Sequence, residues 1–253
     1  MSDTAAVLVT RPEPGGAETA ARVAALGWRP VLAPALVLTP RAFVIPPAQA
    51  LLLTSRAAAR ALPPPVPALP VLAVGEATAA EARLRGWMAC RAAGGTAEEL
   101  AALAAATLDP AGGPLLLAVG QGYSLALAAS LRRRGFRVIR RIAYAATPAR
   151  ALPEPARRAL QEGQVASVLF HSPRSALCAM RLVRAAGLTG AAPRIEALAI
   201  SRRVAEAAAA AIAPLAWRGI RIAGRPDEDA LLSLLGRRDA PAGPGGSFRS
   251  GDS

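Results

Sequence analysis

The sequence predicts an α/β protein with two similar lobes, each built on a sheet of about five parallel strands flanked by helices. Three observations support this prediction. Short apolar runs alternate with stretches of helical periodicity, which is typical of strand–helix–strand units with parallel strands. One strand–turn–helix unit recurs along the chain. Hydrophobic residues make up 53% of the 253 residues, which indicates well-packed cores.

The clearest copy of this unit is the stretch 168–175, V-L-F-H-S-P-R-S. Its apolar run predicts a buried strand. Ser172 and Pro173 indicate a helix start, because serine caps free backbone N–H groups and proline fits the first turn. The strand therefore delivers a hydroxyl, an arginine and backbone donors to one point. That point favours anions, since helix N-termini carry partial positive charge.

The first half of the chain begins with a strand at 7–10, a turn with Arg11 and two glycines, a helix at 17–26 and a strand at 31–33. A proline-broken linker at 37–49 follows. The next units are predicted in this order: a strand ending at Thr54-Ser55-Arg56, a short helix, a strand with Gly75 at its turn and Thr78 near the helix start, a strand at 88–91, and a helix at 97–106 with Thr96 as its cap.

The second half repeats the design. Its predicted elements are a strand that begins at Leu115 and leads into a glycine-containing turn, a helix, a strand ending at Tyr144, a linker at 147–155, a helix at 156–162, the stretch 168–175, and strand–helix units that begin near 195 and 219. From Gly236 onward the sequence has no periodicity, so we expect a disordered tail at 237–253.

The two halves match unit by unit in the order A-B-C-A-B-C, with an offset of roughly 110–125 residues. This order fits two contiguous domains, and it also fits an arrangement in which the first A unit joins the second B and C units. Proline-rich linkers lie between A and B in both halves, which favours the interleaved arrangement. We therefore expect one lobe from 1–36 with 149–236 and another from 37–148.

The chain carries a net charge of +13, from 30 basic and 17 acidic residues, and every basic residue is arginine. Without lysine, covalent catalysis through a Schiff base is excluded. Arginine grips carboxylates through two parallel hydrogen bonds, so a carboxylate-rich ligand is a reasonable partner. A nucleic-acid partner is not expected, because the arginines are spread along the chain and few aromatic side chains are present for base stacking.

Two cysteines and one histidine predict neither a metal site nor a disulfide framework. A serine hydrolase would need His171 beside Ser172, but neighbours in a strand point to opposite faces. The turn G-Q-G-Y-S has too few glycines for a dinucleotide fingerprint and lacks a Walker lysine. No cofactor is expected. No apolar run has the length of a membrane span, and we expect a cytoplasmic monomer.

Ligands of open parallel sheets bind beyond the carboxyl ends of the strands. The residues at those ends are hydroxyls, glycines and arginines: Thr10, Arg11, Thr54, Ser55, Arg56, Gly75, Thr78, Gly120, Ser172, Arg174, Ser201 and Arg202. Two lobes facing across a cleft would pool these donors, and paired carboxylates are absent from them. The set predicts a site that folds a flexible polyanion into shape with little side-chain chemistry.

The motifs V-T-R-P, T-S-R, V-G-E-A-T-A, T-A-E-E-L, R-V-I-R-R-I-A-Y-A-A-T, F-H-S-P-R-S and P-D-E-D-A-L-L together resemble the uroporphyrinogen-III synthase family over residues 7–236. The resemblance implies two flavodoxin-like lobes joined by a two-strand linker. It implies cofactor-free closure of hydroxymethylbilane, an octacarboxylate, with loss of water and inversion of ring D in haem and cobalamin biosynthesis.

Carried over by the same motifs, Ser55, Thr78, Tyr144 and Ser172 fall on the family's cleft positions. Tyr144 is the candidate catalytic residue, as a weak acid that assists departure of the hydroxyl group. The chain has Val119 where the family usually has arginine, and Ser201 and Val204 where it often has glycine and threonine. An inactive paralogue and a non-catalytic binder of an anionic small molecule therefore stay open as alternatives.

Overall fold

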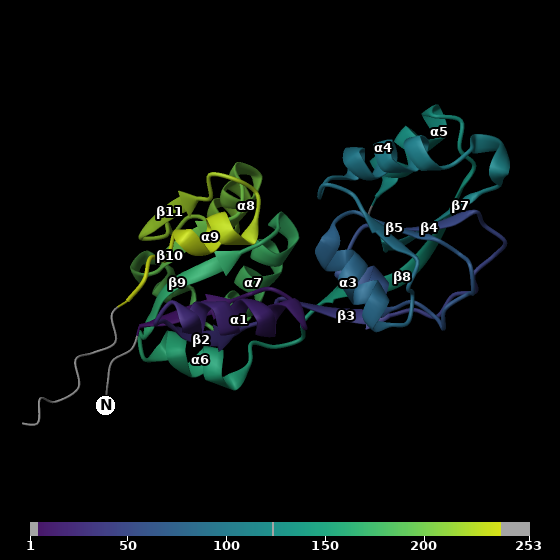
Figure 1. The fold of residues 1–253 in the computed structure, drawn as a ribbon. Helices are drawn as coiled ribbons and strands as arrows, with labels where there is room; N and C mark the ends of the chain where they lie inside the picture. The colour runs from purple at the N-terminus through teal and green to yellow at the C-terminus, as the bar shows by residue number, and fades with distance from the viewer. Residues whose placement is uncertain (1–4, 123, 239–253) are drawn as a thin grey trace, which may run out of the picture. The chain divides into compact units, whose positions relative to one another are not determined.

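The computed structural model describes residues 5–122 and 124–238, which fall into two compact units. Unit 1 combines the chain up to Val37 with the chain from Pro148 onward, and unit 2 is the continuous segment Leu38–Thr147. Each unit holds one sheet with helices on both faces (Figure 1). None of the helices in the described ranges is long and apolar enough to cross a membrane.

The sheet of unit 1 has the order β11-β10-β9-β1-β2, and all its neighbouring strands are parallel. Its strands are β1 (Ala6–Val9), β2 (Arg29–Leu32), β9 (Val165–Phe170), β10 (Glu196–Ala199) and β11 (Gly219–Ile222). Its helices are α1 (Gly15–Ala25), α6 (Glu154–Gln161), α7 (Pro173–Ala185), α8 (Arg202–Ile212) and α9 (Glu228–Ser233), with a 3₁₀ turn at Thr189–Arg194. Numbered along the unit, this strand order is 2-1-3-4-5, the flavodoxin-like order.

The sheet of unit 2 has the order β3-β8-β7-β4-β5-β6. Its strands are β3 (Leu36–Pro40), β4 (Ala50–Leu53), β5 (Val71–Ala73), β6 (Cys90–Ala92), β7 (Leu115–Gly120) and β8 (Val138–Pro148). Its helices are α2 (Arg56–Arg60), α3 (Glu76–Leu84), α4 (Ala97–Thr107) and α5 (Leu125–Arg133), with a 3₁₀ turn at Pro110–Gly112. All neighbours from β8 to β6 are parallel.

Strand β3 occupies the start of the segment 37–49, for which the prolines predict only a linker. Arg41 N–H donates to Ala143 O at 2.7 Å and Ala149 N–H donates to Ala35 O at 3.0 Å, so β3 and β8 run antiparallel. Pro40 stands at the end of this edge strand, where its missing N–H does not interrupt the sheet. The two points where the chain passes between the units, 37–38 and 147–148, lie in these two strands.

The repeat predicted from the sequence is present in both sheets. The sequence repeat makes β1 and β2 the counterparts of β7 and β8, and β9, β10 and β11 the counterparts of β4, β5 and β6. With these replacements, the order β11-β10-β9-β1-β2 becomes β6-β5-β4-β7-β8, which is the order of the parallel strands in unit 2. The counterparts occupy the same places although the chain reaches them in a different sequence. The two halves of the chain have therefore exchanged their A units, β1-α1-β2 and β7-α5-β8.

Both faces of each sheet are covered, which explains why the central strands are apolar throughout. In unit 1, Val7, Val9 and Leu169 pack against α1 and α9. The alternate residues Leu8, Val168 and Phe170 pack against α6, α7 and α8. In unit 2, one face of β4 and β7 packs against α4 and α5, and the other packs against α2 and α3.

The predicted tail at 237–253 falls largely outside the described residues. Arg238, its second residue, donates its N–H to Leu26 O at 2.9 Å, and its guanidinium lies 4.8 Å from the ring centroid of Trp28. Residues 239–253 lie beyond the described ranges.

Candidate functional site

The strand order predicts a ligand crevice in each unit, at the point where consecutive strands send their helices to opposite faces of the sheet. In unit 2 this point lies between β4 and β7, since α2 covers one face and α5 the other. In unit 1 it lies between β1 and β9, which lead into α1 and α7 on opposite faces.

Tyr144, Ser55 and Gly120 lie together at the switch point of unit 2. Gly120 is the register partner of Tyr144 across β7 and β8. The phenol ring folds over this glycine, because a Cβ built there would lie 2.6 Å from Cζ of Tyr144. Ser55 Oγ lies 3.4 Å from the phenolic oxygen. A phenol hydroxyl is therefore held beside the end of β4.

Thr54 stands on the other face of β4. Its Oγ1 lies 3.1 Å from Oγ of Ser124, the residue that precedes α5. Ser55 caps α2 by accepting the N–H of Ala58 at 3.2 Å, and Arg56 is the first residue of that helix. These contacts place several hydroxyls and one arginine at the carboxyl edge of the sheet.

Gly75 and Thr78 lie at the neighbouring strand end. Gly75 is the N-cap residue of α3, and a Cβ at this position would lie 3.5 Å from the Cα of Gly95, so two turns approach closely. Thr78 is buried in the first turn of α3. Within the described residues its hydroxyl has no hydrogen-bond partner, which leaves that group able to bind a ligand or water.

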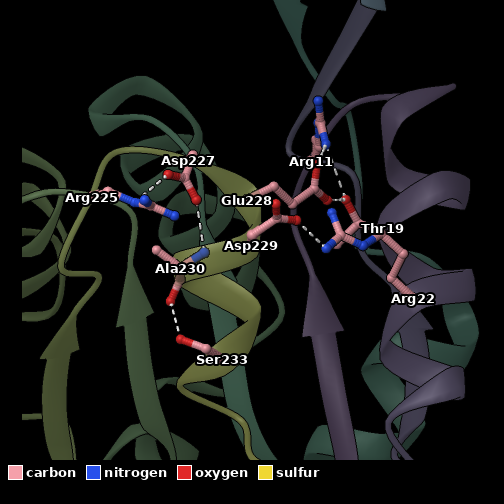
Figure 2. A network of polar contacts seen from close by, with 9 residues as sticks. All are labelled: Arg11, Thr19, Arg22, Arg225, Asp227, Glu228, Asp229, Ala230 and Ser233. Atoms are coloured by element: carbon pink, nitrogen blue, oxygen red, sulfur yellow. Dashed lines mark hydrogen bonds and ion pairs between the residues drawn. The ribbon is translucent and has the colours of Figure 1, made fainter.

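Thr10 and Arg11 follow the end of β1 at the switch point of unit 1. Thr10 is 2% exposed, and its hydroxyl donates to Leu169 O at 2.7 Å, so this side chain ties β1 to β9. Arg11 Nη1 donates to Thr19 Oγ1 at 3.2 Å and pairs with Glu228 at the start of α9 (Figure 2). Thr19 also donates to Glu228, which closes a three-residue network.

The pKa of the Glu228 carboxyl lies below its usual value. Burial works in the opposite direction, but the hydrogen bond from Thr19 and the charge of Arg11 outweigh it. His171 lies near this pair, and neither of its buried ring nitrogens has a hydrogen-bond partner among the described residues. Burial and the nearby Arg11 lower its pKa to about 4, so the imidazole is neutral near pH 7.

Ser172, Arg174, Ser201 and Arg202 complete the unit 1 edge. Ser172 caps α7 and forms a capping box with Ser175, whose N–H it accepts at 3.0 Å. Arg174 is exposed in the first turn of α7. Ser201 precedes α8 without a side-chain cap bond, and Arg202 is exposed and makes no ion pair with any residue in the described ranges.

The sequence matches the family model described as uroporphyrinogen-III synthase HemD over residues 17–233. The chain belongs to the uroporphyrinogen-III synthase family. Its function is the synthase function of that family, in tetrapyrrole synthesis.

The fold is similar to that of a solved uroporphyrinogen-III synthetase. The synthetase structure from Helicobacter pylori 26695 is similar at a TM-score of 0.57 with 17% identity, covering 92% of this chain and 98% of that chain. A mutant uroporphyrinogen III synthase from the extremely thermophilic bacterium Thermus thermophilus matches at 20% identity with a TM-score of 0.47, covering 92% and 96%. No curated protein matches the sequence significantly.

Sequence reasoning missed three residues of these synthase crevices. Ser124, Thr19 and Glu228 each contact a predicted site residue. The acidic first turn of the last helix was a usable signal for Glu228, because carboxylates favour helix N-termini. Its partner Arg11 lies 217 residues away, and only the exchange of A units brings the two together.

The chemistry that these crevices offer is hydrogen bonding and positive charge. No group of three potential metal ligands occurs among the residues that the structure describes. Hydroxyls, helix N-termini and arginines are suited to carboxylates and to a leaving hydroxyl group.

Proposed function

We propose that this synthase is a hydro-lyase that closes hydroxymethylbilane to uroporphyrinogen III without a cofactor, with loss of water and inversion of ring D. The observation that carries the proposal is the phenol of Tyr144, which lies over Gly120 with its hydroxyl oxygen 3.4 Å from Ser55 Oγ. This hydroxyl lies at the switch point of a parallel sheet, the usual place for a ligand.

In the proposed reaction, Tyr144 assists departure of the hydroxyl group from the hydroxymethyl carbon. The electron pair of the pyrrole nitrogen pushes this group out, so a weak acid suffices. The departing hydroxyl takes a proton to become water. The carbon that has lost the hydroxyl bonds to the α-carbon of ring D that already carries the methylene bridge, and the bond between that α-carbon and the methylene then breaks. The released methylene bonds to the free α-carbon of ring D, which loses its hydrogen as a proton, so the net change is the loss of one water molecule.

The larger task is conformational, because the linear bilane must be held so that the direct closure without inversion is avoided. We assign this task to the hydroxyls, backbone donors and arginines at the strand ends. The proposed substrate-binding residues are Thr10, Arg11, Thr54, Ser55, Arg56, Gly75, Thr78, Gly120, Ser172, Arg174, Ser201 and Arg202. The hydroxyl of Thr78 and the exposed guanidinium of Arg202, which have no partner within the described ranges, support this assignment.

The proposal includes a cytoplasmic monomer with no nucleic-acid partner. The wide spread of the arginines along the sequence supports the last point. Light scattering on the purified protein tests the monomeric state. A DNA mobility-shift assay at physiological ionic strength tests the absence of nucleic-acid binding.

The deciding experiment incubates the protein with hydroxymethylbilane and separates the uroporphyrinogen isomers. We expect isomer III, and formation of isomer I alone would overturn the proposal. Tyr144→Phe should lower kcat at least tenfold while the circular dichroism spectrum stays unchanged. Thr107→Ala is the matched control, since its exposed hydroxyl only bonds Leu103 O within α4. Equal rates in the Tyr144→Phe variant and wild type would remove the role of Tyr144.

A further inference from the structure

The Arg11 guanidinium is anchored by only one of its three nitrogens. Nη1 donates to Thr19 and pairs with Glu228, while Thr19 donates to the other carboxylate oxygen of Glu228 (Figure 2). Among the described residues, Nε and Nη2 have no partner. A guanidinium offers two parallel N–H donors along its Nε–Nη2 edge, the geometry that matches a carboxylate. The anchored arginine therefore keeps one recognition edge unoccupied.

Two glycines make the room that this arginine occupies. A Cβ on Gly15 would lie 2.6 Å from Arg11 Nε, and a Cβ on Gly16 would lie 2.8 Å from the Arg11 carbonyl oxygen. Both glycines are buried at the start of α1. Any larger residue at Gly15 would fill the space beside the unoccupied edge.

The pair between Arg11 and Glu228 is partly shielded from water. The side chains of Arg11 and Glu228 are 23% and 20% exposed. The neighbouring pair between Arg22 and Asp229 joins α1 to α9, but its side chains are 45% and 78% exposed (Figure 2). Screening by solvent weakens an exposed pair, so only the Arg11 pair is expected to hold a side chain in one orientation.

Beside this pair the buried imidazole of His171 leaves both ring nitrogens unsatisfied within the described ranges. Val9 and Leu169 both face α1 and α9, as Val7 does. Side chains two residues apart along a strand point to the same face, so His171 and Arg11 are expected on that same face. Unsatisfied buried polar groups are costly, and native proteins that keep them usually do so at functional, water or ion sites.

We propose that Thr19 and Glu228 are positioning residues that orient Arg11, so that its Nε–Nη2 edge receives one carboxylate of the substrate next to His171. This inference rests on the proposed function, because it takes the carboxylate-bearing bilane as the ligand. It assigns to unit 1 a preformed carboxylate subsite made by the ends of β1 and β9 and the first turns of α1 and α9.

Steady-state kinetics with hydroxymethylbilane test the subsite. Arg11→Gln, Glu228→Gln and Thr19→Val should each raise KM, the first roughly tenfold or more, with kcat changed less than twofold, because a distant carboxylate contact acts equally on bound substrate and transition state. Asp229→Asn is the matched control, since it breaks the neighbouring pair on the same helix, and its KM should equal that of wild type.

Arg11→Lys separates binding from a purely structural role. A lysine at this position keeps the charge for Glu228 but loses the planar fork, so the subsite predicts a KM close to that of Arg11→Gln. A KM restored to the wild-type value by lysine would overturn the proposal, because the pairing with Glu228 would then be all that matters.

The single histidine of the chain provides a readout that does not depend on turnover. The imidazole Cε1–H resonance of His171 should shift when uroporphyrin III, a stable octacarboxylate, is added at pH 7, in wild type and in Asp229→Asn but not in Arg11→Gln. An unmoved resonance at saturation would overturn the subsite even if isomer III is formed.

Formation of isomer I alone would instead overturn the proposed function, while the titration would still decide whether Arg11 binds carboxylates. Equal shifts with inorganic phosphate would show a general anion site and contradict carboxylate selectivity.

Discussion

Gly120 acts through the space that it leaves for Tyr144. Its backbone is not in the left-handed region, so alanine brings no conformational strain, yet the added Cβ would lie 2.6 Å from the phenol ring. We expect Gly120→Ala to swing Tyr144 away from Ser55 and to lower kcat about as much as Tyr144→Phe does.

The isomer assay on purified variants checks this expectation. Gly190→Ala is the control, because a Cβ at Gly190 meets nothing within 4 Å and also needs no unusual backbone angle. Wild-type turnover in Gly120→Ala would mean that the position of the phenol does not matter.

His171 makes the stability of unit 1 sensitive to acid. Its pKa is about 4 in the folded protein against an ordinary value of 6.5, because burial and Arg11 disfavour the charged imidazole. Between these values the unfolded chain binds a proton that the folded protein does not. The free energy of unfolding should therefore fall by about 3 kcal/mol as pH decreases from 6.5 to 4, with no further contribution below that range.

Denaturant unfolding of wild type and His171→Gln at several pH values measures this contribution. In a Trp87→Phe background the remaining tryptophans, Trp28 and Trp217, both belong to unit 1, so fluorescence follows that unit. The free energy of unfolding of wild type, taken relative to that of the variant, should rise by about 3 kcal/mol from pH 4 to pH 6.5. Parallel pH profiles would contradict the assignment.

At the scale of elements, the N-cap residues Ser55, Gly75, Ser172 and Ser201 have the same extended backbone at the start of equivalent helices, but they differ in their capping hydrogen bonds. Ser55 and Ser172 accept an N–H from the third residue of their helices, whereas Ser201, like Gly75, makes no such bond. A cap bond contributes about 1 kcal/mol.

We therefore expect Ser172→Ala to lower the free energy of unfolding by about 1 kcal/mol and Ser201→Ala to change it by less than about 0.5 kcal/mol. If Ser201 binds substrate as proposed, its alanine variant should raise KM at unchanged stability. Urea titrations and steady-state kinetics on the same preparations separate the two effects. Equal destabilisation of both variants would contradict the difference in capping.

Helices and central strands were predictable to within a few residues, because apolar runs and caps are local signals. The helix 97–106 occurs as Ala97–Thr107, and the strand 7–10 occurs as Ala6–Val9. Strand β3 was not predictable from its residues, since its prolines conceal an edge strand whose partner lies about a hundred residues away.

The candidate site was predictable in type but not in pairing. The predicted hydroxyls and arginines follow strand ends and therefore lie at the carboxyl edges of the sheets, because parallel strands end at one edge, and their role in substrate binding stays a prediction. Tyr144 and Ser55 are 89 positions apart in the sequence, and Arg11 and Glu228 are 217 positions apart. Local sequence patterns cannot predict contacts between residues so far apart. Thr10 shows the converse case, since a hydroxyl at a strand end proves to be committed to Leu169.

At the scale of the whole molecule, the exchange of A units means that unit 2 is formed by one continuous segment, whereas unit 1 needs two separate segments of the chain. Unit 2 is one segment, Leu38–Thr147, whereas unit 1 needs β1 and β2 from the beginning of the chain and β9, β10 and β11 from the end. The fragment 38–147 should therefore show a cooperative thermal transition on its own, while 148–238 should not. The fragment 148–238 lacks β1, the central strand that pairs with β9. A cooperative transition in this fragment alone would contradict the prediction.

The placement of β1 in the middle of a sheet has a consequence during translation. When the ribosome has made the chain through Pro148, every strand of unit 2 has been synthesised, but β1 has no parallel neighbour except β2. Its apolar residues Val7, Leu8 and Val9 stay without their final partners until β9 leaves the exit tunnel. The nascent N-terminal segment thus exposes apolar residues that chaperones can bind during synthesis.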